Sequence, residues 1–129
     1  MVCMDRGYIY VNKENFLNNI NYLKSLSDKE VCLVVKANGY GHGVEWTVNT
    51  AMEAGVKWFA VATISEAIAV RKMSENIRIL LLTEPSLSEV AKVATNDIDL
   101  TVYNDFFIDG LDKSGFSINT HIKVDTGMH

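Results

Sequence analysis

Residues that would assign this chain to a special class at once are scarce. Its 129 residues include only two cysteines and one proline. Two cysteines are too few for the disulfide framework of a small secreted domain. Because Cys32 also falls inside an apolar run, we expect Cys3 and Cys32 to be free thiols in a reducing compartment.

Long apolar runs and basic clusters are missing as well. No stretch approaches the roughly 18 apolar residues that cross a bilayer, and residues 1–6 do not have the basic and then apolar pattern of a signal peptide. The formal net charge is −4, and the lysines and arginines are scattered, whereas a nucleic-acid-binding face is basic. The apolar fraction of 48% is that of an ordinary globular protein. We therefore expect a cytoplasmic protein with neither a membrane nor a nucleic acid as partner.

Apolar segments of two periods alternate along the chain. Short apolar runs predict buried strands, and between them apolar residues recur at helical spacing. The expected strands are 31–36, 57–62, 78–82, 98–102 and 118–124. Helices are expected after Asn12, at about 44–54, from 63 to about 73, from 86, and from 104 or 105 to about 115.

Local signals support the start of several of these helices. An extended piece at 8–11 precedes the first helix, which Asn12 can cap. Thr63 and Ser86 are each followed three residues later by glutamate, the pattern of a capping box. The apolar face of the first helix carries Phe16, Ile20, Tyr22 and Leu23.

Repeated strand–helix units predict an α/β fold with a parallel sheet and right-handed crossovers. Two architectures fit five units: a closed doubly wound domain of the flavodoxin kind, or the first part of a (β/α)8 barrel, which normally takes about 250 residues. The fifth strand favours the barrel, because Asn119, His121 and Lys123 give it one polar face. A sheet covered by helices on both sides would be apolar on both, whereas a barrel strand can point polar groups toward a site.

Lys36 is the most informative residue, because it ends a buried strand and a glycine-rich turn follows it directly. Partial loss of water favours the neutral, nucleophilic amine, and glycine lets a ligand approach the backbone. The pattern indicates a lysine that forms an imine with a carbonyl compound such as pyridoxal phosphate. From the spacing alone, a solvated strand end is the simpler interpretation. The glycines match neither a P-loop nor a dinucleotide-binding motif.

Two longer motifs strengthen the interpretation of Lys36. Residues 35–43 read VKANGYGHG and residues 121–129 read HIKVDTGMH. Both, in this order, closely resemble motifs of the bacterial alanine racemases. The stretches YIYVN at 8–12, FAVATISEA at 59–67 and ILLL at 79–82 also resemble that family. The second motif is similar to the racemase domain of the serine/alanine racemases linked to glycopeptide resistance.

This resemblance implies a function and roles for three residues. The protein would be a pyridoxal-phosphate-dependent racemase that interconverts L- and D-alanine, or possibly serine, to supply peptidoglycan precursors. Lys36 would hold the cofactor and act as the base on the D-amino-acid side, and Tyr40 would reach toward the cofactor phosphate. Lys123 matches a position that is carboxylated by carbon dioxide in many members; without the family, a lysine paired to Asp125 or another acid is the alternative. His42 and His121 are expected to be polar groups of a loop and a strand. Members of the family act as homodimers.

The resemblance also implies that residues 1–129 are only part of such a protein. They correspond to the N-terminal part of the barrel domain, with 1–11 as its opening strand and 12–129 as βα units. The family motif continues with an arginine directly after His129, and the later strands and the C-terminal β domain, which supplies a tyrosine as the second base, are absent. We expect these residues alone to fold poorly or associate and to have no meaningful racemase activity. The alternative from another class is a non-catalytic module, either a pyridoxal-phosphate carrier or a flavodoxin-like phosphate-binding domain.

Overall fold

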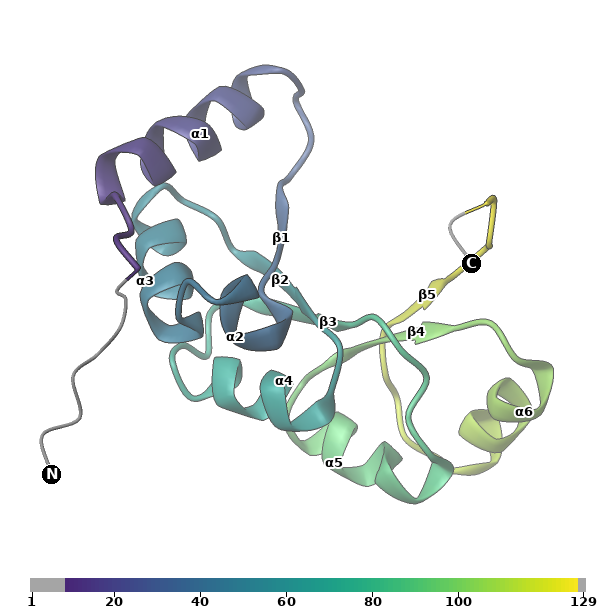
Figure 1. The fold of residues 1–129 in the computed structure, drawn as a ribbon. Coiled ribbons are helices and arrows are strands. Elements are labelled where there is room, and N and C mark those ends of the chain that lie inside the picture. Colours follow the sequence, from purple (N-terminus) through teal and green to yellow (C-terminus); the bar gives the residue numbers. More distant parts are fainter. Residues whose placement is uncertain (1–8, 128–129) are drawn as a thin grey trace, which may run out of the picture.

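The computed structural model describes residues 9–127, which form five strands with helices between them (Figure 1). The strands are β1 (Cys32–Val34), β2 (Trp58–Val61), β3 (Arg78–Leu81), β4 (Asp99–Val102) and β5 (Thr120–Ile122). The helices are α1 (Lys13–Ser25), α2 (Lys36–Tyr40), α3 (Val44–Glu53), α4 (Ile64–Arg71), α5 (Val90–Thr95) and α6 (Asp105–Lys113), and a 3-10 turn, η1 (Leu87–Glu89), precedes α5.

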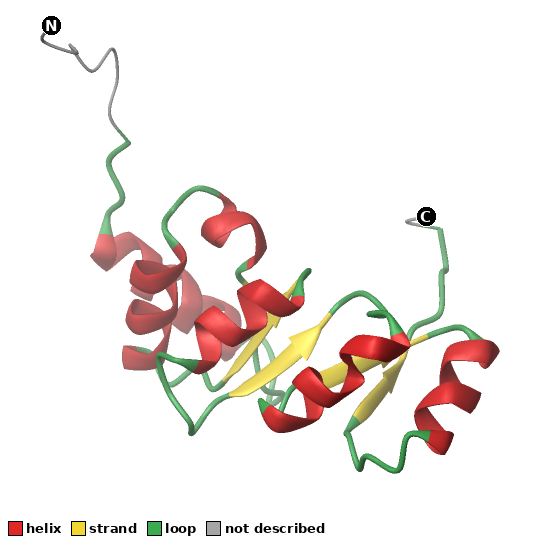
Figure 2. Cartoon of the chain, turned by 90° about the horizontal axis from the view of Figure 1, so that it is seen from below, coloured by secondary structure: helices red, strands yellow, loops and turns green. Residues whose placement is uncertain are grey.

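The five strands form one parallel sheet in the order β1-β2-β3-β4-β5. Each strand therefore lies beside the strand that follows it in sequence, and the main helices follow one another around the outside of the curved sheet (Figures 1 and 2). A flavodoxin-like domain has strand order 2-1-3-4-5, so the doubly wound alternative is wrong. The architecture is the expected partial (β/α)8 barrel.

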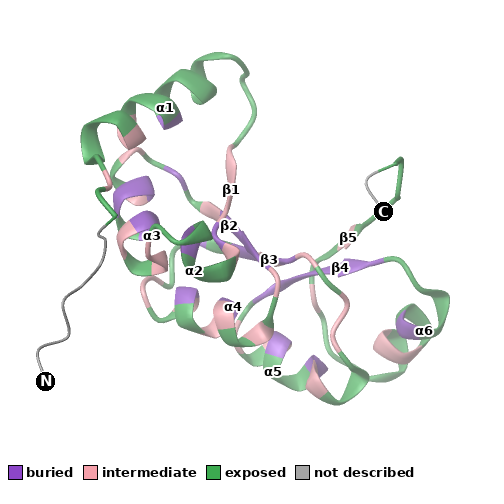
Figure 3. Ribbon diagram, in the orientation of Figure 1, coloured by how far each residue is buried: buried purple, intermediate pink, exposed green. Residues whose placement is uncertain are grey.

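The core lies between the helices and the outer face of the strands (Figure 3). Phe59, Ile79 and Leu100 are fully buried there, at 0% exposure, with helix residues such as Val48 and Val70. Alternate residues of each strand point to the other face of the sheet, which is the interior of the barrel. Asp99 and His121 lie on this inner face, where they contact each other. The predicted polar face of the fifth strand is thus confirmed at His121.

Side-chain caps explain where the helices begin. The Asn12 side chain accepts a hydrogen bond from the backbone N–H of Asn15 at 2.9 Å, as predicted. Thr63 and Glu66 form the expected capping box at the start of α4. Asn104, the first of the two candidates, caps α6.

The structure differs from the expectations mainly at the two ends of the sheet. The outer strands β1 and β5 span three residues each, shorter than expected, because each has a neighbour on one side only within the described residues. Residues 9–11 are in no strand, and the remainder of the expected opening strand lies outside the described residues. On α1, Ile20 is buried but Tyr22 and Leu23 are 65% and 54% exposed, so their assignment to the buried face is wrong.

Between residues 9 and 127, no helix is both long enough and apolar enough to span a membrane.

Candidate active site

Lys36 lies at the carboxyl end of β1, where the chain leaves the sheet. The preceding residue, Val35, is fully buried, and its N–H donates to the carbonyl of Ala60 on β2 at 2.8 Å. Lys36 itself is half-buried, and its ammonium has no hydrogen bond or ion pair with another described residue. In barrels of this kind the carboxyl ends of the strands carry the active site. An amine without a protein partner at this edge is available to a ligand.

The turn after Lys36, α2, is left-handed. Ala37, Asn38, Gly39 and Tyr40 have φ angles between 51° and 63°. A left-handed helix costs about 1–2 kcal/mol per non-glycine residue, because Cβ crowds the following carbonyl oxygen. Backbone strain of this kind persists only where the surrounding structure enforces it, and it is concentrated at functional sites. The glycine-rich turn expected from the sequence is therefore present, in a conformation that the sequence did not predict.

Hydrogen bonds within the turn stabilise this conformation. The N–H of Gly39 donates to the carbonyl of Val35 at 2.9 Å, and the N–H of Gly43 donates to the carbonyl of Asn38 at 3.0 Å. The Asn38 side chain accepts a hydrogen bond from the N–H of Val44, at the start of α3, at 2.8 Å. The His42 ring lies 3.0 Å from the carbonyl of Gly39, a loop role that agrees with the prediction for this histidine.

Gly39 is the buried residue of the turn, and it packs against α3. A Cβ atom at this position would lie 2.8 Å from Oγ1 of Thr47. The Thr47 hydroxyl is itself buried and has no hydrogen-bond partner in the structure. A larger residue at this position would therefore require the Thr47 side chain to shift.

A carboxylate from the next βα unit holds the start of the turn. Glu66 accepts hydrogen bonds from the backbone N–H groups of Ala37 at 2.7 Å, Ala62 at 3.0 Å and Thr63 at 3.1 Å. Burial of Glu66 acts to raise its pKa, but these hydrogen bonds outweigh it and hold the pKa below its ordinary value of 4.5. The carboxylate therefore joins the chain just beyond β1 to the chain just beyond β2.

The other two predicted site residues lie at the same edge. The Tyr40 side chain is 60% exposed. Lys123 follows β5, is exposed, and its Nζ lies 5.4 Å from the centre of the Tyr103 ring. Lys36 and Tyr40 share the turn after β1, whereas Lys123 follows β5, the outer strand on the other side of the sheet. The structure therefore does not bring Lys123 to the other two residues. The described residues contain no group of histidine, cysteine and acidic side chains that could hold a metal ion.

The amino end of the sheet has a different chemistry. Asp99 is buried and accepts hydrogen bonds from Arg78 at 2.9 Å and Asn119 at 3.1 Å, and His121 lies 3.3 Å away. The Arg78 guanidinium also lies 4.4 Å from the centre of the Trp58 ring. The charged groups of this inner cluster thus pair with one another, whereas the buried indole N–H of Trp58 has no hydrogen-bond partner among the described residues.

Cys32 borders the inner cluster and is a free thiol. Burial raises its pKa to about 11, while Arg78 acts to lower it and Asp99 acts to raise it. The thiol is therefore protonated near neutral pH and is a poor nucleophile. Cys3 lies outside the described residues.

Arg71 fastens the loops that lead into β3 and β4. Its side chain is only 12% exposed, and the guanidinium donates to five backbone carbonyls within 2.6–3.4 Å. These belong to Ser74, Glu75, Ile77, Asn96 and Asp97. Arg71 thus binds carbonyls just before β3 and β4. Glu66 makes the converse contacts, with N–H groups just after β1 and β2.

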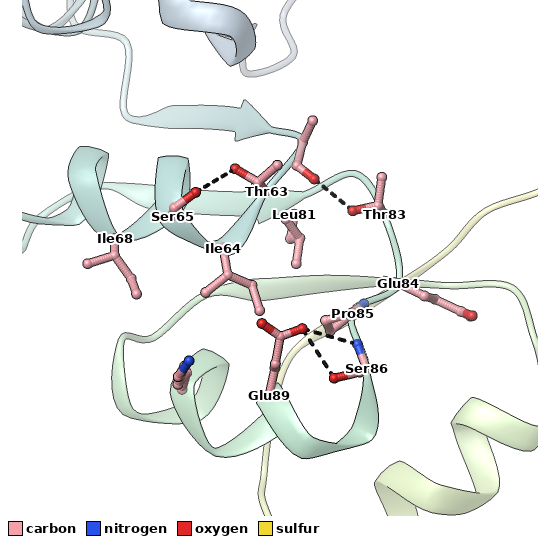
Figure 4. Close-up of a pocket in the computed structure, with 12 residues that line it drawn as sticks. Thr63, Ile64, Ser65, Ile68, Leu81, Thr83, Glu84, Pro85, Ser86 and Glu89 are labelled. Carbon is pink, nitrogen blue, oxygen red and sulfur yellow. Dashed lines mark hydrogen bonds between the residues drawn. The ribbon is translucent and has the colours of Figure 1, made fainter.

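A groove of about 490 Å³ lies between α4 and η1, but it is not the Lys36 site (Figure 4). Glu89 and Ser86 are hydrogen-bonded to each other there, as are Thr63 and Ser65. Because these polar groups already have partners and Lys36 does not line the groove, we assign no ligand to it.

Sequence reasoning identified Lys36 and missed the residues that hold its backbone. Glu66 was recognised as a helix cap, but its reach to Ala37 depends on the distance between two strand ends. Glu84 has a similar role, since it accepts hydrogen bonds from the N–H groups of Tyr103 and Asn104 beyond β4. A glutamate shortly after a strand is the sequence signal for such a residue. The signal does not show which neighbouring strand the glutamate side chain reaches.

Known proteins with similar sequences and structures are racemases, in agreement with a lysine site at the carboxyl edge of a barrel sheet. The model of the family described as "Alanine racemase, N-terminal domain" matches residues 11–129. The chain belongs to this family. It is 41% identical over 128 residues to an amino-acid racemase of Enterococcus faecalis, covering 97% of this chain and 18% of that protein. It is 36% identical over 124 residues to an alanine racemase of Treponema denticola, covering 92% and 33%.

Solved structures of the family have the same fold. The alanine racemase of E. faecalis superposes with a TM-score of 0.85 at 28% identity, covering 92% of this chain and 34% of that one. The alanine racemase of Bacillus anthracis with bound L-Ala-P superposes with a TM-score of 0.81 at 31% identity, covering 90% and 31%. The chain therefore spans about a fifth to a third of the length of these relatives.

Proposed function

We propose that this chain is part of a pyridoxal-phosphate-dependent racemase that interconverts L- and D-alanine. The observation that carries the proposal is the Lys36 amine, which lies at the carboxyl edge of the barrel sheet, has no partner among the described residues, and is followed by a strained turn. Family membership supports the reaction class. The carrier and phosphate-binding alternatives have no support from the sheet order or from the relatives.

The residues around Lys36 fit pyridoxal phosphate. The cofactor has an aldehyde that an amine can attack and a phosphate that hydroxyl groups can bind. Lys36 provides the amine, and the exposed Tyr40 phenol in the same turn provides a hydroxyl group. A Cβ at Gly41 would meet nothing within 4 Å, so this side of the turn is open. When bound, the cofactor would delocalise the negative charge left at the substrate α-carbon after loss of its proton.

Racemisation requires that a proton leave one face of the α-carbon and that another be delivered to the opposite face. The Lys36 amine would take and return the proton on the D-amino-acid side. A single lysine serves one face only. We propose that a second base acts on the other face and is supplied by a part of the protein beyond the described residues, across a homodimer.

Lys123 would be carboxylated on its amine and would orient a neighbouring cation. Carboxylation needs the neutral amine, which an interior site can supply, whereas the Lys123 side chain is exposed among the described residues. We therefore propose that carboxylation occurs where other parts of the protein cover Lys123. Intact-mass measurement of the full chain, with and without bicarbonate, tests this modification.

Alanine is proposed as the substrate because several relatives at 36–38% identity are named alanine racemases, with serine as the second candidate. Supply of D-alanine for peptidoglycan precursors, in the cytoplasm, is the corresponding cellular role. The relative with 41% identity is named only as an amino-acid racemase. Its name leaves the side-chain preference open, so both substrates belong in the assay.

The test is racemisation of L-alanine and of L-serine by the full-length protein with pyridoxal phosphate. Lys36→Ala should abolish turnover, and added methylamine should restore part of it by replacing the missing amine. Lys57→Ala, which removes an exposed lysine from the opposite end of β2, should leave turnover unchanged. Full activity of the Lys36→Ala variant without added amine would contradict the proposal.

A further inference from the structure

Glu66 connects the lysine turn to the neighbouring βα unit. One carboxylate oxygen, Oε1, accepts from Ala37, and the other, Oε2, accepts from Ala62 and Thr63. We propose that Glu66 is a positioning residue for Lys36: by holding the N–H of Ala37, it fixes the direction in which the lysine leaves β1. This inference rests on the proposed cofactor role of Lys36.

The planarity of the peptide bond gives this contact its effect. The carbonyl of Lys36 and the N–H of Ala37 belong to one rigid plane. A hydrogen bond to that N–H therefore sets the orientation of the whole plane, and with it the ψ angle of Lys36. At 2.7 Å and with a charged acceptor, this is a short, strong hydrogen bond.

Packing alone cannot hold the turn in place. Ala37 and Asn38 are exposed, and only Gly39 of the left-handed residues is buried. A cavity of about 250 Å³, lined in part by Asn38 and Glu66, lies beside the turn and leaves space for it to rearrange. Since the turn is strained and loosely packed, its hydrogen bonds decide its conformation.

Glu66 does more than cap α4, and a second capping box provides the comparison. Glu89 in η1 contacts the N–H and hydroxyl of Ser86, three residues before it, and the structure gives it no contact with another strand end. Glu66 makes the corresponding local contact with Thr63 and reaches Ala37, 29 residues away, in addition. The two glutamates therefore differ in one contact, the hydrogen bond from the N–H of Ala37, which is the contact next to Lys36.

The experiment measures the affinity of the full chain for pyridoxal phosphate by absorbance titration, and maps the modified lysine after borohydride reduction. In Glu66→Gln, the amide has one acceptor oxygen for two sets of N–H donors, so one set is left unpaired. We expect affinity to fall about tenfold, the effect of losing one hydrogen bond to a charged group, and the fraction of label on Lys36 to fall.

Two control variants separate positioning from helix capping. Glu89→Gln weakens a capping box away from Lys36. Thr63→Ala removes the hydroxyl cap of α4 and the hydroxyl contact with the Glu66 carboxylate, but not the N–H of Ala37 that this carboxylate accepts from. Both should bind the cofactor within about twofold of wild type. A fall in all three variants alike would mean that capping alone matters, and would overturn the inference.

A measurement on the unmodified protein covers the case in which Glu66→Gln does not fold. The amide-proton chemical shift of Ala37 should titrate together with the Glu66 carboxyl group, because the two are hydrogen-bonded. An Ala37 amide that does not follow this titration overturns the inference.

The outcomes also distinguish this inference from the proposed function. Wild-type protein labelled at Lys36, with Glu66→Gln equal to it, overturns only the positioning role. Wild-type protein with no label at Lys36 overturns the proposed function and this inference with it.

Discussion

The two ends of the sheet satisfy their backbone and side chains in opposite ways. At the amino end, Arg71 donates to carbonyls that precede two strands, and Asp99 gathers three polar side chains around itself. At the carboxyl end, Glu66 and Glu84 accept from N–H groups that follow three strands. The charged groups of the amino end pair with one another, whereas at the carboxyl end the Lys36 amine has no partner within residues 9–127.

This difference separates stability from function. Substitutions at the amino end should change the free energy of unfolding and leave cofactor binding at Lys36 intact. Substitutions around the lysine turn should weaken cofactor binding even where they change the free energy of unfolding only slightly.

Arg71 should be the most sensitive position at the amino end. Arg71→Ala removes the donor of five carbonyls, three of them in part-buried contacts, so the free energy of unfolding should fall by about 3 kcal/mol, since part-buried carbonyls left unpaired are costly. Urea denaturation of the full chain measures it. The neighbouring exposed Lys72→Ala is the control and should change stability by less than about 0.5 kcal/mol. An Arg71→Ala variant as stable as wild type would break the comparison.

Asp99 should come second. Asp99→Ala leaves Arg78 and Asn119 without their acceptor and should lower the free energy of unfolding by about 2 kcal/mol, a reduced value because Arg78 is 48% exposed. Cofactor labelling at Lys36 should not change. The exposed Asp112→Ala is the matched control, and a loss of labelling in Asp99→Ala alone would show that the two ends are coupled.

Gly39 tests how tightly the lysine turn is constrained. Gly39→Ala should destabilise by about 1–2 kcal/mol, because its Cβ meets the Thr47 hydroxyl and φ is positive. Thr47→Ala alone should be nearly neutral, since that hydroxyl has no partner. The double variant should recover part of the loss, with a coupling of about 1 kcal/mol. Strict additivity of the two substitutions would contradict the contact.

The acid side of the stability curve should report on Glu66. Its pKa is lower in the folded protein than its ordinary value of 4.5, so the ionised group stabilises the fold above that value. This contribution is lost as pH falls through the folded-state pKa. Glu66→Gln should therefore flatten the pH dependence of stability below about pH 4.5. The same curve in wild type and variant would contradict the role of the carboxylate.

Local patterns in the sequence predicted most of the fold. Strand order, the caps at Asn12, Thr63 and Asn104, and the polar inner face of the fifth strand all follow from residue type and period. The exposed Tyr22 was predicted wrongly, because helical spacing alone does not say how wide the buried face of a helix is. An expected strand at 8–11 was not found at residues 9–11.

The site was predicted less completely than the fold. Lys36 and Tyr40 stand in a motif of consecutive residues, so the sequence could identify them. The left-handed conformation of Ala37 and its hydrogen bond to Glu66 could not be predicted, because both depend on how closely two strand ends approach. Arg71 and Asp99 were missed for the same reason: the Arg71 contact with Asn96 spans 25 residues of sequence, and the Asp99 contact with Asn119 spans 20.

The most direct measurement is a peptide map of the full-length protein after incubation with pyridoxal phosphate and reduction with borohydride. The account predicts that the label is found on Lys36, that it survives Asp99→Ala, and that it is diminished by Glu66→Gln. A label spread over exposed lysines such as Lys57 and Lys72, with none on Lys36, would contradict it.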